Sequence, residues 1–404
     1  MKVLQINITV NSGSTGRIAE DIGSVLIDSG YKSLIGFGRG NQQSKSETIR
    51  IGGKWDIWMH GMQTILFDRH GLASKAATKD FLKIVRQWSP DIIHLHNIHG
   101  YYLNYPILIK YLLEIKIPVV WTLHDCWTFT GHCVHYENIG CYKWETKCFR
   151  CPKKTKYPSA YLLDNSEYNY NYKKDLFNQL EDVTFVVPSH WLKDELGRSF
   201  LSNFPSIVIH NGIDLNIFKP DLSSTITQGF VNKKIILGVA SVWQKSKGWY
   251  DFIELAKYVD SDNYQIVLIG VSEKQKMELP SNIHGILKTE SVIELAAWYS
   301  RSIVFVNPTY LDTFPTTNLE SLACGTPVIT YNTGGSPECL DQETGYVLEK
   351  GDVKGIWEFV QIISKFGKQY YSAVCRDKAI LKFNKDDRYS DYLNLYSKIL
   401  GKNS

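Results

Sequence analysis

Short apolar runs rich in valine and isoleucine recur along the chain and alternate with longer segments of helical periodicity. They lie at residues 3–8, 91–96, 119–123, 183–187 and 207–209, and again at 235–240, 265–269, 303–307 and 328–331. Such runs, separated by helices, are typical of strands in parallel sheets that are covered on both faces. The pattern therefore predicts an α/β protein with two doubly wound, Rossmann-like sheets.

The length of 404 residues exceeds what one hydrophobic core usually supports, which favours two domains of roughly 200 residues each. A turn beginning at His210 and a polar stretch beginning at Lys219 indicate the boundary. We expect a first domain over residues 1–212, a second over 213–387, and a C-terminal helix over 388–404 that crosses back onto the first. A ligand cleft between the domains follows from this organisation.

A segment rich in cysteine, lysine and tyrosine, residues 126–175, fits neither the helical nor the strand period and is predicted to be an irregular insertion. Four of its cysteines have the spacing C-x7-C-x6-C-x2-C: Cys133, Cys141, Cys148 and Cys151. This spacing leaves two interpretations open, a structural zinc site and free buried thiols. A zinc ion bound by four thiolates has no open coordination position, so it would do no chemistry.

The formal charge of +4 is small for this length and argues against nucleic acid as a partner. Positive charge is concentrated within the insertion, where Glu145 is the sole acid among residues 141–156. The six cations of that stretch are Lys143, Lys147, Arg150, Lys153, Lys154 and Lys156. They form either a solvated face or a contact with anionic lipid headgroups or a lipid-phosphate acceptor.

No apolar run approaches the length of about 18 residues that a membrane-spanning helix needs. The chain opens on a strand-like run without the pattern of a secretory signal. We expect a cytoplasmic protein, in contact with a membrane only at the inner face of the cytoplasmic membrane. Disulfides are disfavoured in that reducing compartment.

The most informative segment runs from Asp312 to Glu338. Two carboxylates eight positions apart, Asp312 and Glu320, flank small hydroxylated residues, and a glycine pair follows the next strand. Helix N-termini and glycines suit phosphate oxygens, and carboxylates accept hydrogen bonds from sugar hydroxyls. Taken singly, these features are also an ordinary helix capping box and a turn. Their order favours a site for a sugar nucleotide.

This order resembles the C-terminal signature of retaining GT-B glycosyltransferases of family four, the glycosyl transferases group 1, and is similar to that of bacterial capsular and exopolysaccharide enzymes. The family usually has Glu, seven residues and Glu, whereas this chain has Asp312 at the first position. The resemblance implies two Rossmann-like domains facing a cleft. It also implies transfer of a sugar from a UDP- or GDP-linked donor, with retention and without a catalytic metal. The implied acceptor is a hydroxyl of a growing saccharide or a lipid-linked acceptor, in capsule, lipopolysaccharide or related synthesis.

The resemblance also assigns donor-binding roles in the second domain. Asp312 orients the donor hexose and Glu320 holds the ribose hydroxyls. Lys247 clamps the departing diphosphate, with Lys245 as a substitute for an arginine that the family usually carries and this chain lacks. The remaining donor-binding residues are Phe314, Pro315, Thr316, Thr317, Gly334 and Gly335.

In the first domain, the implied residues follow the predicted strands. Gly13 and Gly16 form a glycine loop after the first strand, and His124 ends the strand at 119–123 and contacts the donor sugar. With Asp312 and Lys247, His124 completes the set expected at the reaction centre. Residues of the loop after the strand at 91–96 are candidates for acceptor contact: Asn97, His99, Tyr101 and Tyr102.

Two other functions remain open at this point. A nucleotide-sugar epimerase needs an acid and a base at one sugar carbon, and the sequence offers no convincing second group. A sugar-nucleotide-binding protein without catalysis is compatible with the aspartate at 312 and the missing arginine.

Overall fold

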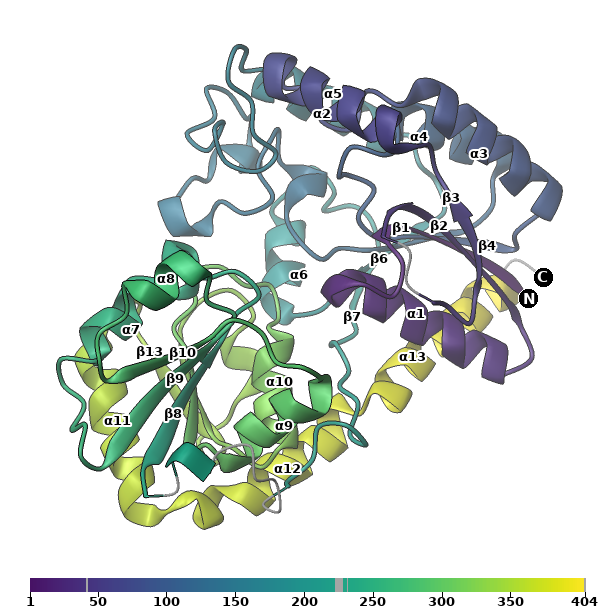
Figure 1. Ribbon diagram of the computed structural model, residues 1–404. Coiled ribbons are helices and arrows are strands. Elements are labelled where there is room, and N and C mark those ends of the chain that lie inside the picture. The colour runs from purple at the N-terminus through teal and green to yellow at the C-terminus, as the bar shows by residue number, and fades with distance from the viewer. Residues whose placement is uncertain (41–42, 222–227, 231, 403–404) are drawn as a thin grey trace. The chain divides into compact units, whose positions relative to one another are not determined.

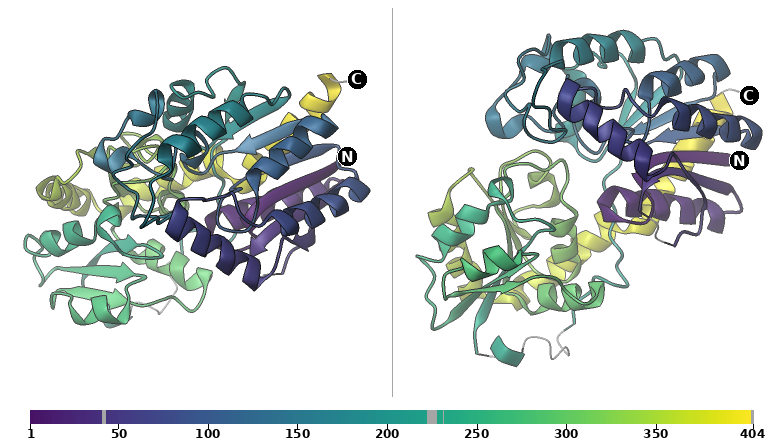
Figure 2. Two further views of the ribbon diagram at one scale, coloured as in Figure 1. Left: turned by 90° about the horizontal axis from the view of Figure 1, so that it is seen from above. Right: turned by 45° about the horizontal axis from the view of Figure 1, so that its top comes forward.

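The computed structural model describes residues 1–40, 43–221, 228–230 and 232–402, and it divides into two compact units (Figure 1). Unit 1 comprises Met1–Ile209 and Tyr389–Ser404, and unit 2 comprises His210–Arg388. Each unit contains a parallel sheet with helices packed against it (Figure 2). The predicted class, an α/β protein with two parallel sheets, is confirmed.

Unit 1 is built on a seven-stranded parallel sheet in the order β3-β2-β1-β4-β5-β6-β7. Its strands are β1 (Lys2–Thr9), β2 (Lys32–Arg39), β3 (Glu47–Arg50), β4 (Ile92–Leu95), β5 (Val119–Thr122), β6 (Val183–Val187) and β7 (Ser206–Val208). Its helices are α1 (Gly13–Asp28), α2 (Lys54–Phe67), α3 (Lys75–Trp88), α4 (Tyr105–Ile115), α5 (Ser166–Phe177), α6 (His190–Gly197) and most of α13 (Lys385–Lys402). The strand order reverses between β1 and β4, where ligands of doubly wound sheets bind at the carboxyl ends.

Alternating side chains of β1 divide the core of unit 1 into two layers. Val3 packs in one layer with residues of α1 and α13, whereas Leu4 and Ile6 pack in the other with residues of α3 and α4. Hydrogen bonds tie α13 to this sheet: the hydroxyl of Tyr396 lies 2.6 Å from Nδ1 of the buried His94. The C-terminal helix therefore belongs to the core of unit 1.

Unit 2 contains a six-stranded parallel sheet in the order β10-β9-β8-β11-β12-β13. Its strands are β8 (Lys234–Val239), β9 (Tyr264–Ile269), β10 (Ile283–Ile286), β11 (Val304–Asn307), β12 (Val328–Tyr331) and β13 (Gly345–Leu348). Its helices are α7 (Trp249–Leu255), α8 (Glu273–Met277), α9 (Val292–Arg301), α10 (Thr316–Ala323), α11 (Val353–Phe366) and α12 (Lys368–Phe383). Two short 3-10 helices border the segments of interest, η5 (Lys245–Lys247) and η6 (Pro337–Cys339).

Four strands lie outside the runs predicted from the sequence: β2, β3, β10 and β13. Their apolar character is interrupted by glycines and charged residues, so they lack a continuous hydrophobic run. Gly36 within β2 lies against Phe81, where a β-carbon would approach the ring to 2.6 Å. Close packing of helix and sheet explains a glycine that weakened the strand signal.

The insertion is irregular only over its first part. Between β5 and α5 the chain forms three short 3-10 helices, η1 (Trp127–Phe129), η2 (Glu137–Ile139) and η3 (Lys143–Glu145). The prediction of irregular structure as far as residue 175 is wrong, because α5 begins at Ser166. Its buried face repeats with helical spacing but is partly polar, since it includes Asn169 and Lys173. Hydrophobic periodicity alone could not reveal it.

Among the described residues, no helix combines the length and the apolar character needed to cross a bilayer.

Candidate active site

In unit 2, the predicted donor-binding residues gather on two loops beyond the carboxyl ends of β11 and β12. The first loop carries Asp312 and leads into α10, and the second carries Gly334 and Gly335 and leads into η6. The two loops are joined directly, because the Gly335 N–H donates to the Asp312 carbonyl at 3.2 Å. Asp312 and the glycine pair, which are 22 or more positions apart in the sequence, are thus held next to each other.

A chain of buried hydrogen bonds fixes the start of α10 against the second loop. Asn318 accepts from Asn307 Nδ2 at 2.8 Å and donates to Ser336 Oγ at 3.2 Å. Thr330 completes the chain, with its hydroxyl 2.9 Å from the Asn307 carbonyl and 2.7 Å from Ser336 Oγ. All four side chains are buried, so a break would leave polar groups unpaired. Asn307 and Asn318 were not predicted from the sequence. The feature that could have indicated them is an asparagine, Asn318, at a buried position among the apolar residues of α10.

Lys247 and Asp312 form an ion pair of 2.8 Å, and both side chains are partly exposed, at 34% and 20%. The ammonium also donates to the Leu311 carbonyl at 3.2 Å. Lys247 is brought here by the turn at Gly248, whose φ of +76° and contact with Pro308 exclude a side chain: a β-carbon would lie 2.6 Å from the Pro308 carbonyl oxygen. Lys245 lies on the same turn and is exposed.

The segment where the family carries an arginine contains Ser241, Val242 and Trp243. Trp243 is buried and donates from Nε1 to the Ile269 carbonyl at 2.9 Å, while the side chains of Ser241 and Val242 are exposed. None of these three residues is a cation. The cations described in this part of unit 2 are therefore Lys245 and Lys247 of η5.

Glu320 lies within α10 and is almost fully buried. Its Oε2 accepts from the hydroxyl of the fully buried Tyr299 at 3.0 Å. Burial, together with the Glu320 carboxylate, raises the pKa of Tyr299 well above its usual range, so this hydroxyl remains a donor. The carboxylate is thereby held in one orientation.

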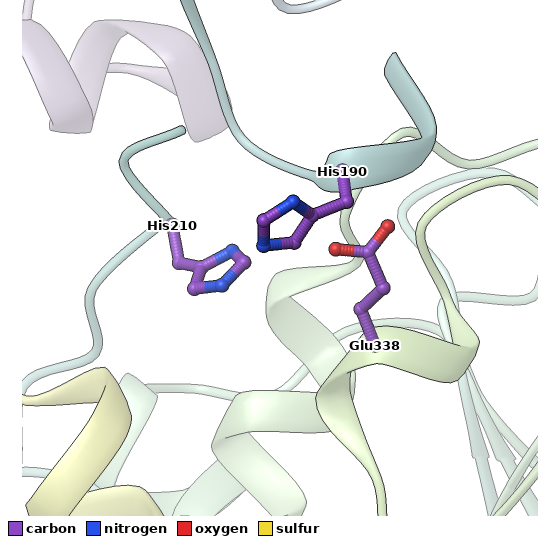
Figure 3. A group of neighbouring side chains, drawn as sticks. All are labelled: His190, His210 and Glu338. Atoms are coloured by element: carbon purple, nitrogen blue, oxygen red, sulfur yellow. The ribbon is translucent and has the colours of Figure 1, made fainter. Parts of the chain in front are cut away.

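Phe314 is held by the first residues of unit 2. The ring of His210 stacks on Phe314 with centroids 4.7 Å apart, and Asn211 Nδ2 donates to the Phe314 carbonyl at 3.2 Å. A ring nitrogen of His210 and a carboxylate oxygen of Glu338 lie within 4.8 Å of each other. Figure 3 shows the side chains of His210 and Glu338. Both residues border the predicted donor loop. Glu338 ends the segment singled out in the sequence but was given no role there, and His210 was not named as a site residue.

In unit 1, His124 follows β5 and ends a chain of hydrogen-bonded side chains. Its Nε2 lies 3.0 Å from Nδ1 of His96, whose Nε2 lies 3.0 Å from Oε1 of Gln5. Gln5 donates from Nε2 to the Ala19 carbonyl at 2.8 Å, so its Oε1 is the acceptor. His96 must then carry its proton on Nε2 and accept at Nδ1, which assigns the Nε2–H tautomer to His124.

Both rings of this chain are neutral near pH 7. Burial lowers the pKa of His124 to about 4, against the opposing effect of Asp125. Burial and the neighbouring His94 and His124 lower the pKa of His96 well below its usual range. In the neutral tautomer assigned above, Nδ1 of His124 is an acceptor suited to a sugar hydroxyl.

A second pair of side chains joins the loop after β4, which carries His99, to the loop after β5, which carries Asp125. His99 Nε2 lies 2.8 Å from Asp125 Oδ2, and the Trp127 N–H donates to Oδ1 of the same carboxylate at 2.9 Å. Burial alone would raise the pKa of Asp125, but the charge and hydrogen bond of His99 lower it to about 2. An ionised Asp125 therefore orients the His99 ring.

The other acceptor candidates differ in exposure. Asn97 and Tyr101 are half-buried. The guanidinium carbon of Arg39 lies over the Tyr101 ring, 5.6 Å from the ring centroid. Tyr102 is fully buried in the core and donates to the Asn97 carbonyl at 2.8 Å. The prediction that Tyr102 contacts an acceptor is wrong, because its side chain has no exposed surface and instead packs in the core.

The glycine loop after β1 turns directly into α1. Gly13 is exposed, with φ at +66°, and Gly16 is buried, where a β-carbon would lie 2.6 Å from Thr9 Oγ1. The Asn11 N–H donates to the Gly16 carbonyl at 3.1 Å and closes the turn. The backbone of this loop lies at the carboxyl end of β1, beside the switch point of the sheet.

Models of two protein families match the chain. Residues 37–217, mainly in unit 1, match "Glycosyltransferase Family 4", and residues 233–365, in unit 2, match "Glycosyl transferases group 1". Together the two matches cover well over half of the chain.

Individual proteins of known name are also similar. The putative colanic acid biosynthesis glycosyl transferase WcaC of Escherichia coli K12 is 25% identical over 382 residues, 87% of this chain and 88% of WcaC. The E. coli UDP-Gal:alpha-D-GlcNAc-diphosphoundecaprenol alpha-1,3-galactosyltransferase is 27% identical over 208 residues, which are 47% of this chain and 53% of that enzyme. The crystal structure of Anabaena Alr3699/HepE in complex with UDP superposes with a TM-score of 0.69 at 14% identity, covering 98% of this chain and 100% of that one. The last similarity shows the fold alone.

Because both units match models of one enzyme group and each has the expected parallel sheet, the chain belongs to the family 4, group 1 glycosyltransferases and has the GT-B fold.

Proposed function

We propose that the protein is a retaining glycosyltransferase that moves a hexose from a UDP- or GDP-linked donor to a hydroxyl of a growing saccharide or lipid-linked acceptor. The observation that carries this proposal is the pairing of Lys247 with Asp312 beside the joined loops of unit 2. A cation for the diphosphate and a carboxylate for the hexose stand next to backbone N–H groups at the start of α10. These groups match the two halves of a sugar nucleotide.

The charge that develops in the reaction explains this arrangement. As the bond between sugar and phosphate breaks, negative charge accumulates on the departing diphosphate. A fixed ammonium and the positive end of α10 stabilise that charge more strongly in the transition state than in the bound donor. Asp312 holds the Lys247 ammonium in place before the donor arrives, so little reorganisation is needed.

The other donor contacts follow from the same loops. Glu320, oriented by Tyr299, is proposed to accept from the ribose hydroxyls. The glycine pair allows the backbone to approach the diphosphate. The HepE structure is a complex with UDP, and the name of the galactosyltransferase relative gives a UDP-linked donor. Both support a nucleotide diphosphate donor here.

Unit 1 is proposed to supply His124 to the donor sugar and the His99 loop to the acceptor. Neutral His124 accepts from a sugar hydroxyl at Nδ1. We assign no side chain as a covalent nucleophile; the family resemblance implies attack on the same face from which the phosphate departs. No metal is assigned to this step.

An exposed apolar face on α2 supports a lipid-linked acceptor and contact with a membrane surface. Trp55 and Trp58 stack with centroids 4.9 Å apart and are 71% and 51% exposed. Further exposed apolar side chains of α2 and of the insertion are Met59, Met62, Ile65, Phe67, Tyr161, Leu162 and Leu163. Backbone hydrogen bonds join the two segments, and Lys154 and Lys156 of the insertion lie close in sequence. Aromatic and cationic side chains in this combination suit an anionic lipid interface.

The names of the relatives support a place in bacterial surface polysaccharide synthesis. WcaC is named for colanic acid biosynthesis, and the partial relative is named for a diphosphoundecaprenol-linked acceptor. We propose a reaction of the same kind for this chain.

The proposal predicts that one nucleotide diphosphate sugar stabilises the protein and is consumed only when an acceptor is present. Thermal shifts with UDP-, GDP- and ADP-sugars identify the donor, because a ligand at 100 times its Kd adds about 2.7 kcal/mol of stability. Soluble and lipid-linked saccharides are then compared as acceptors, and NMR of the product gives the anomeric configuration. Inversion would contradict retention. Epimerised donor without acceptor would identify an epimerase, and binding without turnover a sensor.

Lys247→Ala should lower kcat on the order of 100-fold while the donor KM changes little, because the lost charge acts mainly in the transition state. Steady-state kinetics with the identified donor measures both constants. Lys257→Ala, an exposed lysine of unit 2 paired with Glu254, is the matched control and should retain wild-type turnover. A Lys247→Ala variant with normal kcat and only a raised KM would reduce Lys247 to an anchor for the substrate.

His96→Phe should lower kcat/KM about tenfold, the effect of one hydrogen bond worth about 1.4 kcal/mol. NMR of ring-labelled histidine should find His124 neutral at pH 6 in the wild-type protein and protonating near pH 4. Since the folded pKa lies below the unfolded value of 6.5, this group lowers stability as pH falls from 6.5 to about 4. In His96→Phe, His124 should lose its preference for the Nε2–H tautomer. The control is His60→Asn, which replaces a buried histidine paired with Ser74 and Gly71 and should leave the His124 tautomer unchanged. An unchanged His124 tautomer in His96→Phe would exclude the hydrogen-bonded chain from Gln5 through His96 to His124.

A further inference from the structure

Residues 123–165 of unit 1 form a long segment without an α-helix or a strand. Its packing centres on three aromatic rings: Trp144 lies 5.0 Å from Phe129 and 4.8 Å from Tyr136, between ring centroids. These rings belong to the hydrophobic core of unit 1, whereas most of the segment around them is loop. A cross-link such as a metal ion or disulfides would fix these loops.

The four cysteines singled out in the sequence come together in this segment. Cys133 and Cys151 are hydrogen-bond partners, and Cys141 and Cys148 pack against the same hydrophobic cluster that contains Cys133. Cys133 is buried and the other three are half-buried. Four thiols from three parts of the segment therefore lie in one neighbourhood.

The C-x2-C turn has a conformation that presents its sulfurs to backbone donors. Arg150, the residue before the second cysteine, has φ at +45°. The Gly131 N–H donates to Cys148 Sγ at 3.3 Å, and the Lys153 N–H bonds Cys151. Gly131 cannot carry a side chain, because a β-carbon would lie 2.7 Å from the Cys148 β-carbon and 2.1 Å from the Ser166 carbonyl oxygen. Hydrogen bonds of this kind stabilise the thiolate form.

We propose that Cys133, Cys141, Cys148 and Cys151 bind one structural zinc ion as a tetrathiolate. Thiolates are preferred zinc ligands, and a closed set of four is typical of structural sites. Each cysteine loses its proton to solvent as its sulfur binds the ion. The site closes two loops and is separate from the residues proposed for glycosyl transfer.

The surrounding charges suit a doubly negative tetrathiolate. Lys173 is buried beneath the cluster and donates to the Trp127 and Thr130 carbonyls at 2.7 and 3.0 Å. The Lys173 ammonium also lies 3.4 Å from the centroid of the Trp127 ring. Zinc would supply the charge that makes four thiolates stable together.

The sulfurs must draw closer to bind the ion. Among the side chains that the structure describes, no three of these sulfurs all lie within 4.8 Å of one another. Zn–S bonds of about 2.3 Å place the sulfurs of a tetrahedral site about 3.8 Å apart. The segment can make this adjustment because, apart from the three short 3-10 helices, it is loop between β5 and α5.

The ion would fix the two parts of the segment that contact His99, one containing Asp125 and the other containing Tyr157. Asp125 precedes the first ligand and bonds Nε2 of His99, and Tyr157 follows the last ligand with its hydroxyl 3.4 Å from Nδ1 of the same ring. Loss of the metal should therefore loosen the His99 loop.

Elemental analysis of the full-length protein, produced with zinc supplementation under reducing conditions, should find one zinc ion per chain. Cys133→Ser, Cys141→Ser, Cys148→Ser and Cys151→Ser should each reduce the zinc content several-fold. The matched controls Cys126→Ser, a buried cysteine of the same segment, and Cys375→Ser, a buried cysteine of unit 2, should retain it. Wild-type protein without zinc, or full zinc content in Cys148→Ser, would overturn the proposal.

Cobalt replacement tests the same site in wild-type protein, so the test does not depend on the variants folding. Cobalt(II) should give thiolate-to-metal charge-transfer absorption with tetrahedral d–d bands, and a chelator should abolish both and lower Tm. Absence of the charge-transfer band would exclude thiolate ligation. Mass spectrometry after thiol alkylation gives the competing result: wild-type protein in which these four cysteines resist alkylation as disulfides would overturn the zinc assignment.

Discussion

A buried hydrogen-bonded asparagine underlies the arrangement of the proposed donor site in unit 2. Asn318 links Asn307 at the end of β11 to Ser336 beyond β12, and so fixes α10 relative to the glycine pair. Without this link, two loops that share one backbone hydrogen bond could separate. The side chain is fully buried, so its loss would leave Asn307 and Ser336 partly unsatisfied, at about 1–3 kcal/mol for each group. Preorganisation of the donor loops thus rests on the core of the unit.

Each unit fixes one polar side chain in place, Lys247 in unit 2 and His124 in unit 1, but by a different kind of interaction. In unit 2 an ion pair holds the Lys247 ammonium beside the loops proposed to bind the donor diphosphate, and a turn that only glycine fits brings the lysine there. In unit 1 a neutral chain from Gln5 through His96 assigns the proton of His124. Both devices begin at the carboxyl ends of parallel strands, where side chains and loops can be fixed by the sheet.

The sequence predicted those parts of the molecule whose chemistry is local. Valine-rich runs predicted most of the central strands, whereas the donor-binding role of the Asp312 to Glu338 segment, inferred from the order of its motifs, stays a prediction. Strand β13 and helix α5 were missed because their buried faces contain glycine, asparagine or lysine, whose burial is compensated by tertiary contacts. Gln5 and Asn318 were missed for the same reason: a polar residue within an apolar run has no periodic signal. Tyr102 shows the opposite error, since aromatic residues after a strand suggested a surface but the ring completes the core.

The central claim, that the asparagine-linked loops of unit 2 form the nucleotide diphosphate site, is tested most directly by calorimetric titration of Asn318→Ala. The titrant is the nucleoside diphosphate that wild-type protein binds most tightly, and circular dichroism at the titration temperature verifies that the variant is folded. Asn332→Ala, an exposed asparagine of the second loop paired with Glu349, serves as the control. The account predicts at least about tenfold weaker binding for Asn318→Ala, since about 1.4 kcal/mol of loop positioning is lost, and wild-type affinity for the control. Wild-type affinity in a folded Asn318→Ala protein would contradict it.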